Sequence, residues 1–206
     1  MTGGATSRAA DRAAARRAAR LVRDAGRLRD GTPVRVRPLV AQDRALLVAG
    51  FAALSLRSRR ARFLQGVSDA QFARMLPILL DTVDQRAHVA LVLYAAGRPI
   101  GVGRLRRFTG DPGVADLAIT VADDWQGRGA GSVLARELLA RAGDLREIRT
   151  VVSADNPASV GSVALARAPG GGGAAWPRRL AGWVDLEPLA RTPTGRRSPG
   201  SGSRPR

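Results

Sequence analysis

Short apolar segments separated by turns run through most of the chain, and their pattern predicts a mixed α/β fold. Five segments have the apolar density or alternation of β-strands: residues 34–39, 88–94, 100–105, 114–121 and 148–153. Three have apolar side chains at helical spacing: the stretch after Asp43, the stretch from Ser68, and residues 131–142. Because a short Gly-containing turn separates residues 88–94 from 100–105, we expect these two strands to form a hairpin.

Helix signals at two places refine this pattern. Ser68 with Gln71 three residues later has the form of a capping box, and Pro77 is expected to kink or end the helix that Ser68 begins. Residues 7–29 predict an Ala/Arg helix, in which four arginines at spacing four line one face and few large apolar side chains are available to bury. Such a helix is marginal alone, so we expect it to be an appendage.

Three regions follow from these boundaries. Residues 1–31 form a basic Ala/Arg-rich N-terminal extension, residues 32–190 form one domain, and residues 191–206 have the Pro, Gly, Ser and Arg composition of a disordered basic tail. Within the domain the pattern weakens near its end, where Gly170 to Gly173 are consecutive glycines, and residues 183–189 are the last segment that resembles a strand.

Composition excludes several classes of site. The chain has no Cys and one His, which rules out disulfides and cysteine nucleophiles and argues against a His-based metal site, so we expect no metal. No apolar run reaches the roughly 20 residues needed to cross a bilayer, and no apolar core follows the N-terminal arginines. We therefore expect a soluble cytoplasmic protein without a membrane partner.

The net charge of +17 raises nucleic acid as a partner. More than half of this excess lies in the two ends, since residues 1–31 hold eight Arg against three Asp and residues 191–206 hold five Arg and no acid. The absence of Lys beside abundant Arg, Ala and Gly is typical of a GC-rich coding sequence, which inflates Arg without selection for binding. Association of the arginine-rich ends with nucleic acid stays an alternative.

The segment with the clearest chemistry is the glycine-rich loop between the predicted strand 114–121 and the predicted helix 131–142. Gly127, Gly129 and Gly131 permit positive φ angles and close approach of the backbone, so that successive N–H groups can point at one anion. The N-terminus of the following helix adds its positive dipole end. A pyrophosphate fits this arrangement, and Arg128 or Arg136 are candidates to add direct charge.

Two common nucleotide motifs do not fit the loop. A P-loop requires Gly-Lys-Ser/Thr after the glycines, which is absent. A Rossmann fingerprint reads Gly-x-Gly-x-x-Gly, whereas this loop reads Gly-x-Gly-x-Gly, and Glu147 precedes the next strand instead of ending it.

The segment Gln126-Gly127-Arg128-Gly129-Ala130-Gly131 resembles the Gln/Arg-x-x-Gly-x-Gly/Ala signature of GNAT acetyltransferases. The order of predicted elements matches that family over roughly residues 34–159, and the stretch Leu54 to Leu64 is similar to a segment of GNAT domains related to bacterial protein-lysine acetyltransferases. The resemblance implies a mixed, mostly antiparallel central sheet flanked by helices. It also implies acetyl-CoA as cosubstrate.

The same resemblance implies roles for individual residues. The backbone at Ile119 and Val121 would pair with the pantetheine arm, and Asn156 would contact the cofactor or its bound water. The pyrophosphate would be held by the loop and the start of the helix: Gln126, Gly127, Arg128, Gly129, Ala130, Gly131 and Ser132. Asp116 would act as the general base that takes a proton from the amine, directly or through water.

A general acid is not evident. The family often uses a Tyr in a later helix, but the single tyrosine here, Tyr94, lies in the predicted hairpin and is expected in the core. Ser159 and Ser162 are the remaining candidates, and His88 is expected to be structural. Beyond Asn156 the chain departs from the family pattern, because no Gly-Phe pair opens a last strand.

The expected function is transfer of an acetyl group from acetyl-CoA to the amine of a protein lysine or a small molecule. The alternative from the same fold is a degenerate domain that binds acyl-CoA as a sensor without turnover.

Overall fold

The computed structural model describes residues 20–63, 66–143, 145–150 and 179–182. These residues include a sheet in which seven strands follow one another in sequence order. The strands are β1 (Arg23–Arg27), β2 (Pro33–Pro38), β3 (His88–Ala95), β4 (Arg98–Phe108), β5 (Asp111–Val121), β6 (Glu147–Thr150) and β7 (Arg179–Gly182). The pairs from β1 to β5 are antiparallel, whereas β5–β6 and β6–β7 are parallel. The predicted mixed, mostly antiparallel sheet is confirmed.

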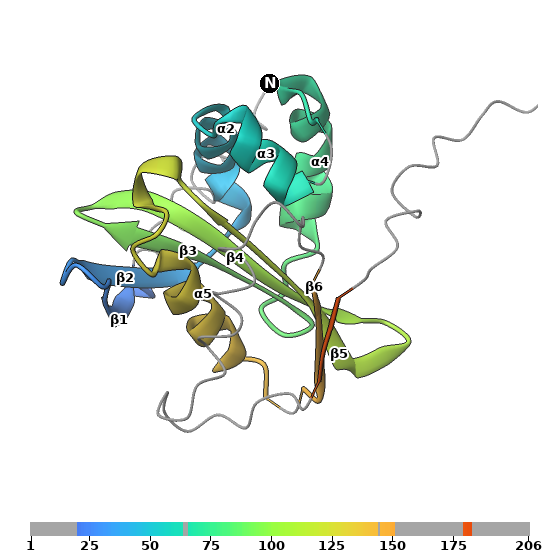
Figure 1. The fold of residues 1–206 in the computed structure, drawn as a ribbon. Helices are drawn as coiled ribbons and strands as arrows, with labels where there is room; N and C mark the ends of the chain where they lie inside the picture. The colour runs from blue at the N-terminus through green and yellow to red at the C-terminus, as the bar shows by residue number, and fades with distance from the viewer. Residues whose placement is uncertain (1–19, 64–65, 144, 151–178, 183–206) are drawn as a thin grey trace, which may run out of the picture.

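Helices lie on both faces of this sheet (Figure 1). On one side are α2 (Arg44–Ala52), α3 (Leu56–Phe63) and α4 (Asp69–Asp81), and on the other is α5 (Ala130–Leu139). Two short 3₁₀ helices, η1 (Ala41–Asp43) and η2 (Asp123–Trp125), precede α2 and α5. Periodicity predicted two helices before the hairpin and missed α3, because none of the α3 residues is buried and its sequence LRSRRARF has no apolar stripe.

The core between the sheet and α5 positions the glycine loop. Leu134 and Leu138 of α5 are fully buried against β3, β4 and β5. Gly103 of β4 makes the close approach possible, because a Cβ on this residue would lie 2.8 Å from Cδ1 of Leu138. The predicted core-facing residues of this helix, which also include Val133 and Leu139, are confirmed.

A second core lies under α2 and α4. Strand β3 is therefore buried on both faces, which explains why its sequence is a continuous apolar run. The rings of Phe51 and Phe72 stack with centroids 4.1 Å apart. The Ser68–Gln71 capping box is confirmed, with Gln71 N–H donating to Ser68 Oγ at 3.2 Å and Ser68 N–H donating to Gln71 Oε1 at 2.8 Å.

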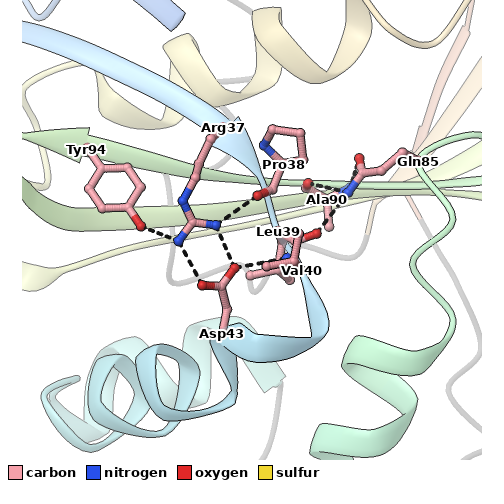
Figure 2. Close-up of polar contacts among 8 residues, drawn as sticks. All are labelled: Arg37, Pro38, Leu39, Val40, Asp43, Gln85, Ala90 and Tyr94. Atoms are coloured by element: carbon pink, nitrogen blue, oxygen red, sulfur yellow. Dashed lines mark hydrogen bonds and ion pairs between the residues drawn. The ribbon is translucent and has the colours of Figure 1, made fainter. Parts of the chain in front are cut away.

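The junction between β2 and α2 is held by a buried ion pair (Figure 2). Arg37 donates to both carboxylate oxygens of Asp43 at 2.7 and 2.8 Å and to the Tyr94 hydroxyl at 2.6 Å. Nearby, the Gln85 side-chain amide donates to the carbonyls of Leu39 and Ala90, which extends the pairing where β2 ends. Tyr94, predicted in the core, is half-buried at its edge: it packs against the second core, and Arg37 engages its hydroxyl.

Two predictions about helices were wrong. The Ala/Arg helix predicted for residues 7–29 does not extend through its last part, because residues 23–27 form β1, antiparallel to β2. There Ala25 and Leu28 are buried against the sheet, and Gly26 has a φ of 88°, outside the helical region. The second error is the alternative that Pro77 ends its helix, because Pro77 lies inside α4, on the exposed side where water can solvate the carbonyl that loses its donor. The other alternative, a kink at Pro77, stays a prediction.

Several predicted features lie outside the described residues: residues 1–19, the strand at 183–189, the basic tail, and Asn156, Ser159 and Ser162. Within the described part of the chain, no helix combines the length and the apolar character that crossing a membrane requires.

Candidate active site

The glycine loop joins η2 to α5 with two residues in the left-handed region. Gly127 has a φ of 74°, and Gly129, the N-cap of α5, has a φ of 93°. Among the described residues, no acceptor takes the backbone N–H groups of residues 127–132, whereas the N–H of Val133 already donates to the Gly129 carbonyl at 3.1 Å. The loop therefore presents a set of free donors at the positive end of α5, which suits an anion.

Gln126, predicted to contact the cofactor, makes several hydrogen bonds within the protein. Its N–H donates to the Asp123 carbonyl at 3.2 Å, and its side-chain amide donates to Ser58 Oγ at 3.0 Å and to the Val121 carbonyl at 3.1 Å. Gln126 thus holds the loop in place, and its own N–H is already engaged.

Asp123, a residue that was not among the predicted site residues, joins the loop to α3. Its carboxylate accepts from the Ser55 N–H at 2.6 Å and from the hydroxyl of Ser58. Burial alone would raise the pKa of Asp123, but the hydrogen bonds from Ser58, Ser55 and Gln126 outweigh it and lower the pKa. The available signal was an acid three residues before Gln126, at the start of η2.

The two arginines expected to add charge are engaged by the segment that contains β1. Arg128 lies with its guanidinium 4.9 Å from the Trp125 ring centroid and 3.5 Å from the Asp30 carboxylate. Arg136 donates to the Ala25 carbonyl at 2.8 Å. A third arginine, Arg29, lies beside the loop, with its Cγ 3.3 Å from where a Cβ on Gly129 would be, and no local motif indicated it.

Asp116 lies on the face of β5 that is turned toward α3. It stands directly opposite Arg106 of β4, and Ala118 and Thr120 follow it on the same face, as predicted from alternation. Burial raises the pKa of the Asp116 carboxyl, and the nearby charges of Arg62, Arg106 and Arg104 partly oppose that rise.

Behind Asp116 a buried pair links β3 and β4. The Thr82 hydroxyl donates to the Ile78 carbonyl and therefore accepts from Nδ1–H of His88, at 2.8 Å in each case. Nε2 of His88 is left to accept from Nε and Nη2 of Arg104, at 3.2 and 2.8 Å. Burial, with the charges of Arg104 and Arg106, lowers the pKa of His88 to about 4, so the imidazole is neutral at pH 7.

Among the described residues, the edge of β5 that faces β6 is paired over only part of its length. The described β5–β6 ladder runs from Val114–Glu147 to Asp116–Arg149, and the two strands lie side by side at one end of β5 (Figure 1). In the described part of the chain no partner strand follows β5 from there to Val121 on this side. Ile119 and Val121 are half-buried on this stretch and pack against the α5 core.

The chain matches a known protein family and is similar in sequence to a curated relative. The family model described as "Acetyltransferase (GNAT) family" matches residues 49–165. The acetyltransferase PA5475 of Pseudomonas aeruginosa is 35% identical over 136 residues, which are 64% of this chain and 72% of that protein.

Two solved structures share the fold and 27% sequence identity with the chain. The GNAT domain of S. lividans PAT superposes with a TM-score of 0.62, covering 72% of this chain and 88% of that domain. A cAMP-binding acyltransferase from Mycobacterium smegmatis gives a TM-score of 0.53 over 79% of this chain, which spans about half (48%) of that protein's length.

Proposed function

The chain belongs to the GNAT acetyltransferase family and is an acyltransferase, and from this premise we propose that it transfers the acetyl group of acetyl-CoA directly to an amine. The observation that carries the proposal is the set of backbone N–H groups of residues 127–132 that have no acceptor among the described residues and that meet at the start of α5. A bound pyrophosphate would satisfy these donors.

The residues around the loop fit acetyl-CoA, which supplies an activated acetyl thioester when bound. Gly127, Arg128, Gly129, Ala130, Gly131 and Ser132 would hold the pyrophosphate through their N–H groups. Arg29 would add the charge that Arg128 and Arg136 do not offer freely, since it lies beside Gly129. The backbone near Ile119 and Val121, which has no partner strand toward β6 among the described residues, would pair with the pantetheine arm, and Asn156 stays a predicted contact.

Asp116 is the proposed general base. An amine attacks only in its neutral form, so a base must take its proton as the C–N bond forms and the thioester C–S bond breaks. The raised pKa of Asp116 makes its carboxylate a stronger base than an exposed aspartate. Because the side chain of Asp is one methylene shorter than that of Glu, it leaves room for a relay water. Tyr94 is not proposed as the acid, because its hydroxyl is held by Arg37.

Thiol release from acetyl-CoA, measured over a panel of amines, tests this function. We expect turnover by the wild-type chain and a loss in kcat of at least about 10²-fold in Asp116→Asn, with little change in the KM for acetyl-CoA. Asp81→Asn is the matched control, because Asp81 is an exposed residue at the end of α4. A fully active Asp116→Asn would remove Asp116 from the base role.

Thermal shift with acetyl-CoA separates the remaining possibilities. Stabilisation without turnover on any amine would favour the sensor function, and absence of both signals would contradict acetyl-CoA binding altogether. Association with nucleic acid through the arginine-rich ends predicts that deleting residues 191–206 weakens retention on heparin and leaves acetyl-CoA binding unchanged.

A further inference from the structure

Arg104 is a buried cation whose bonded partner carries no charge. Arg104 is 9% exposed, and its Nε and Nη2 donate to Nε2 of His88. Because the imidazole is neutral, the pair keeps one full positive charge. Among the described residues no carboxylate forms an ion pair with Arg104, and a buried charge without a counterion is costly.

Two further arginines surround the same place. Arg106 follows Arg104 on the same face of β4, is exposed, and stands directly opposite Asp116. Arg62 of α3 is half-buried, and its charge interacts with those of Asp116 and Arg104. The charges of these three guanidinium groups all act on the Asp116 carboxylate. A second carboxylate, Asp84, accepts from the His88 N–H at 2.9 Å, so among the described residues three positive charges outnumber two negative ones at this part of the sheet.

Arg106 makes part of this positive charge accessible to a ligand, because its side chain is exposed. Among the described residues, every side-chain nitrogen or oxygen that is fully buried has a hydrogen-bond partner. Nη1 of Arg104 takes no acceptor among the described residues, so this nitrogen is not fully buried. Planar guanidinium groups bind carboxylate and phosphate oxygens through paired hydrogen bonds.

We propose that Arg104, Arg106 and Arg62 form an anion subsite that selects small acceptor amines carrying a carboxylate or phosphate a few bonds from the nitrogen. The proposal rests on the proposed function, with the amine at Asp116. Side chains directly opposite on neighbouring strands have Cβ atoms about 5 Å apart. This short distance favours an acceptor in which the amine and the anion belong to one compact molecule, such as an amino acid. A protein substrate would have to supply the two groups from a lysine and a separate acidic residue.

The test compares acceptors that differ only in the anion. An α-amino acid is paired with its carboxamide, phosphoethanolamine with ethanolamine, and a lysine peptide with acidic flanks serves as the third arm. We expect kcat/KM to favour the charged member of one small pair by about 10- to 100-fold, and the favoured pair distinguishes carboxylate from phosphate. Arg106→Gln should abolish that preference, so that the ratio of kcat/KM between the charged and the neutral member falls to about one, whatever the variant does to the rate they share through Asp116. Arg98→Gln, an exposed arginine at the other end of β4, is the matched control and should keep the preference.

Equal rates on the charged and neutral members, or turnover confined to the acidic peptide, would overturn the subsite. A second measurement does not depend on turnover: titration of an N-acetyl amino acid and an N-acetylated phosphoethanolamine into the wild-type chain and Arg106→Gln by calorimetry. Weaker binding to Arg106→Gln supports the subsite even if every amine fails as an acceptor, in which case the proposed function alone fails. Absence of binding to the wild-type chain, or equal binding to both proteins, overturns the subsite.

Discussion

The side-chain amide of Gln126 lies 3.0 Å from Ser58 Oγ, and this contact ties the loop that presents the N–H donors to helix α3. Asp123 strengthens the link, since its carboxylate accepts from Ser55 and Ser58 at the N-terminal part of α3. The same helix contributes Arg62 near Asp116. The proposed cofactor loop and the proposed acceptor side of the sheet therefore share one support.

Loss of the Asp123 charge should loosen this support. In Asp123→Asn the Ser55 N–H and the Ser58 hydroxyl lose a charged acceptor, so we expect the free energy of unfolding to fall by about 1–2 kcal/mol. The KM for acetyl-CoA should rise several-fold while kcat changes less. Urea denaturation and steady-state kinetics measure the two effects. Asp124→Asn is the control, because Asp124 is the exposed neighbouring residue, and equal effects of the two variants would contradict the prediction.

The left-handed backbone at Gly127 should matter for anion binding by itself. A Cβ there would meet no atom within 4 Å, so Gly127→Ala changes backbone preference without a steric clash. Holding a non-glycine residue at a φ of 74° costs about 1–2 kcal/mol, and relaxation of the loop would misdirect its N–H groups. We expect the Kd for acetyl-CoA to rise about tenfold, measured by calorimetry.

Gly110→Ala supplies the control for that substitution. Gly110 also has open space around its Cα, and its φ is not positive. An unchanged Kd in Gly127→Ala, or an equal rise in Gly110→Ala, would show that the conformation of Gly127 is not required.

His88 should make stability depend on pH. The pKa of its imidazole is lowered from 6.5 to about 4 by burial and by the charges of Arg104 and Arg106. The unfolded chain therefore binds the proton first, and the stability present above pH 6.5 is lost as the pH falls toward 4. Allowing for partial screening by solvent, we expect this loss to be on the order of 2 kcal/mol.

His88→Gln removes the titrating group and keeps a hydrogen-bonding side chain. The difference in the free energy of unfolding between pH 7 and pH 4.5 should be smaller in this variant than in the wild-type chain. Urea denaturation at both pH values measures it. Parallel losses in the two proteins would assign the pH dependence to carboxyl groups instead.

The Arg37–Asp43 pair should be strongly coupled in stability (Figure 2). Asp43→Ala leaves the Arg37 guanidinium buried without a counterion, so we expect it to cost about 3–5 kcal/mol. The double variant Arg37→Met/Asp43→Ala should cost much less than Asp43→Ala alone, which a double-mutant cycle by urea denaturation would reveal. Strictly additive effects would contradict this coupling.

Tyr94→Phe tests the hydroxyl in the same network. It removes one hydrogen bond from Arg37, so we expect a loss of about 1 kcal/mol in stability with kcat unchanged. A large fall in kcat with a stable fold would instead assign the hydroxyl a place in the chemistry.

A short stretch of sequence was sufficient to predict the elements whose apolar residues recur at the period of the buried face. The hairpin of β3 and β4, the capping box at Ser68 and the buried face of α5 follow from period-two and period-3.6 patterns and from a cap. It failed for α3 and β1, because α3 buries no residue and β1 gains its stability from pairing with β2. A short window of residues shows neither the helical conformation of α3 nor the pairing partner of β1.

The sequence by itself determined the order of elements, the glycine loop before α5 and the face of β5 on which Asp116 lies, because glycine content and strand alternation are local properties. The tertiary structure alone decided what surrounds these features. Strand register sets Arg106 opposite Asp116, packing buries Arg104 against His88, and the return of β1 places Arg29 beside Gly129. These contacts join residues far apart in the chain, and their geometry exists only once the sheet has formed.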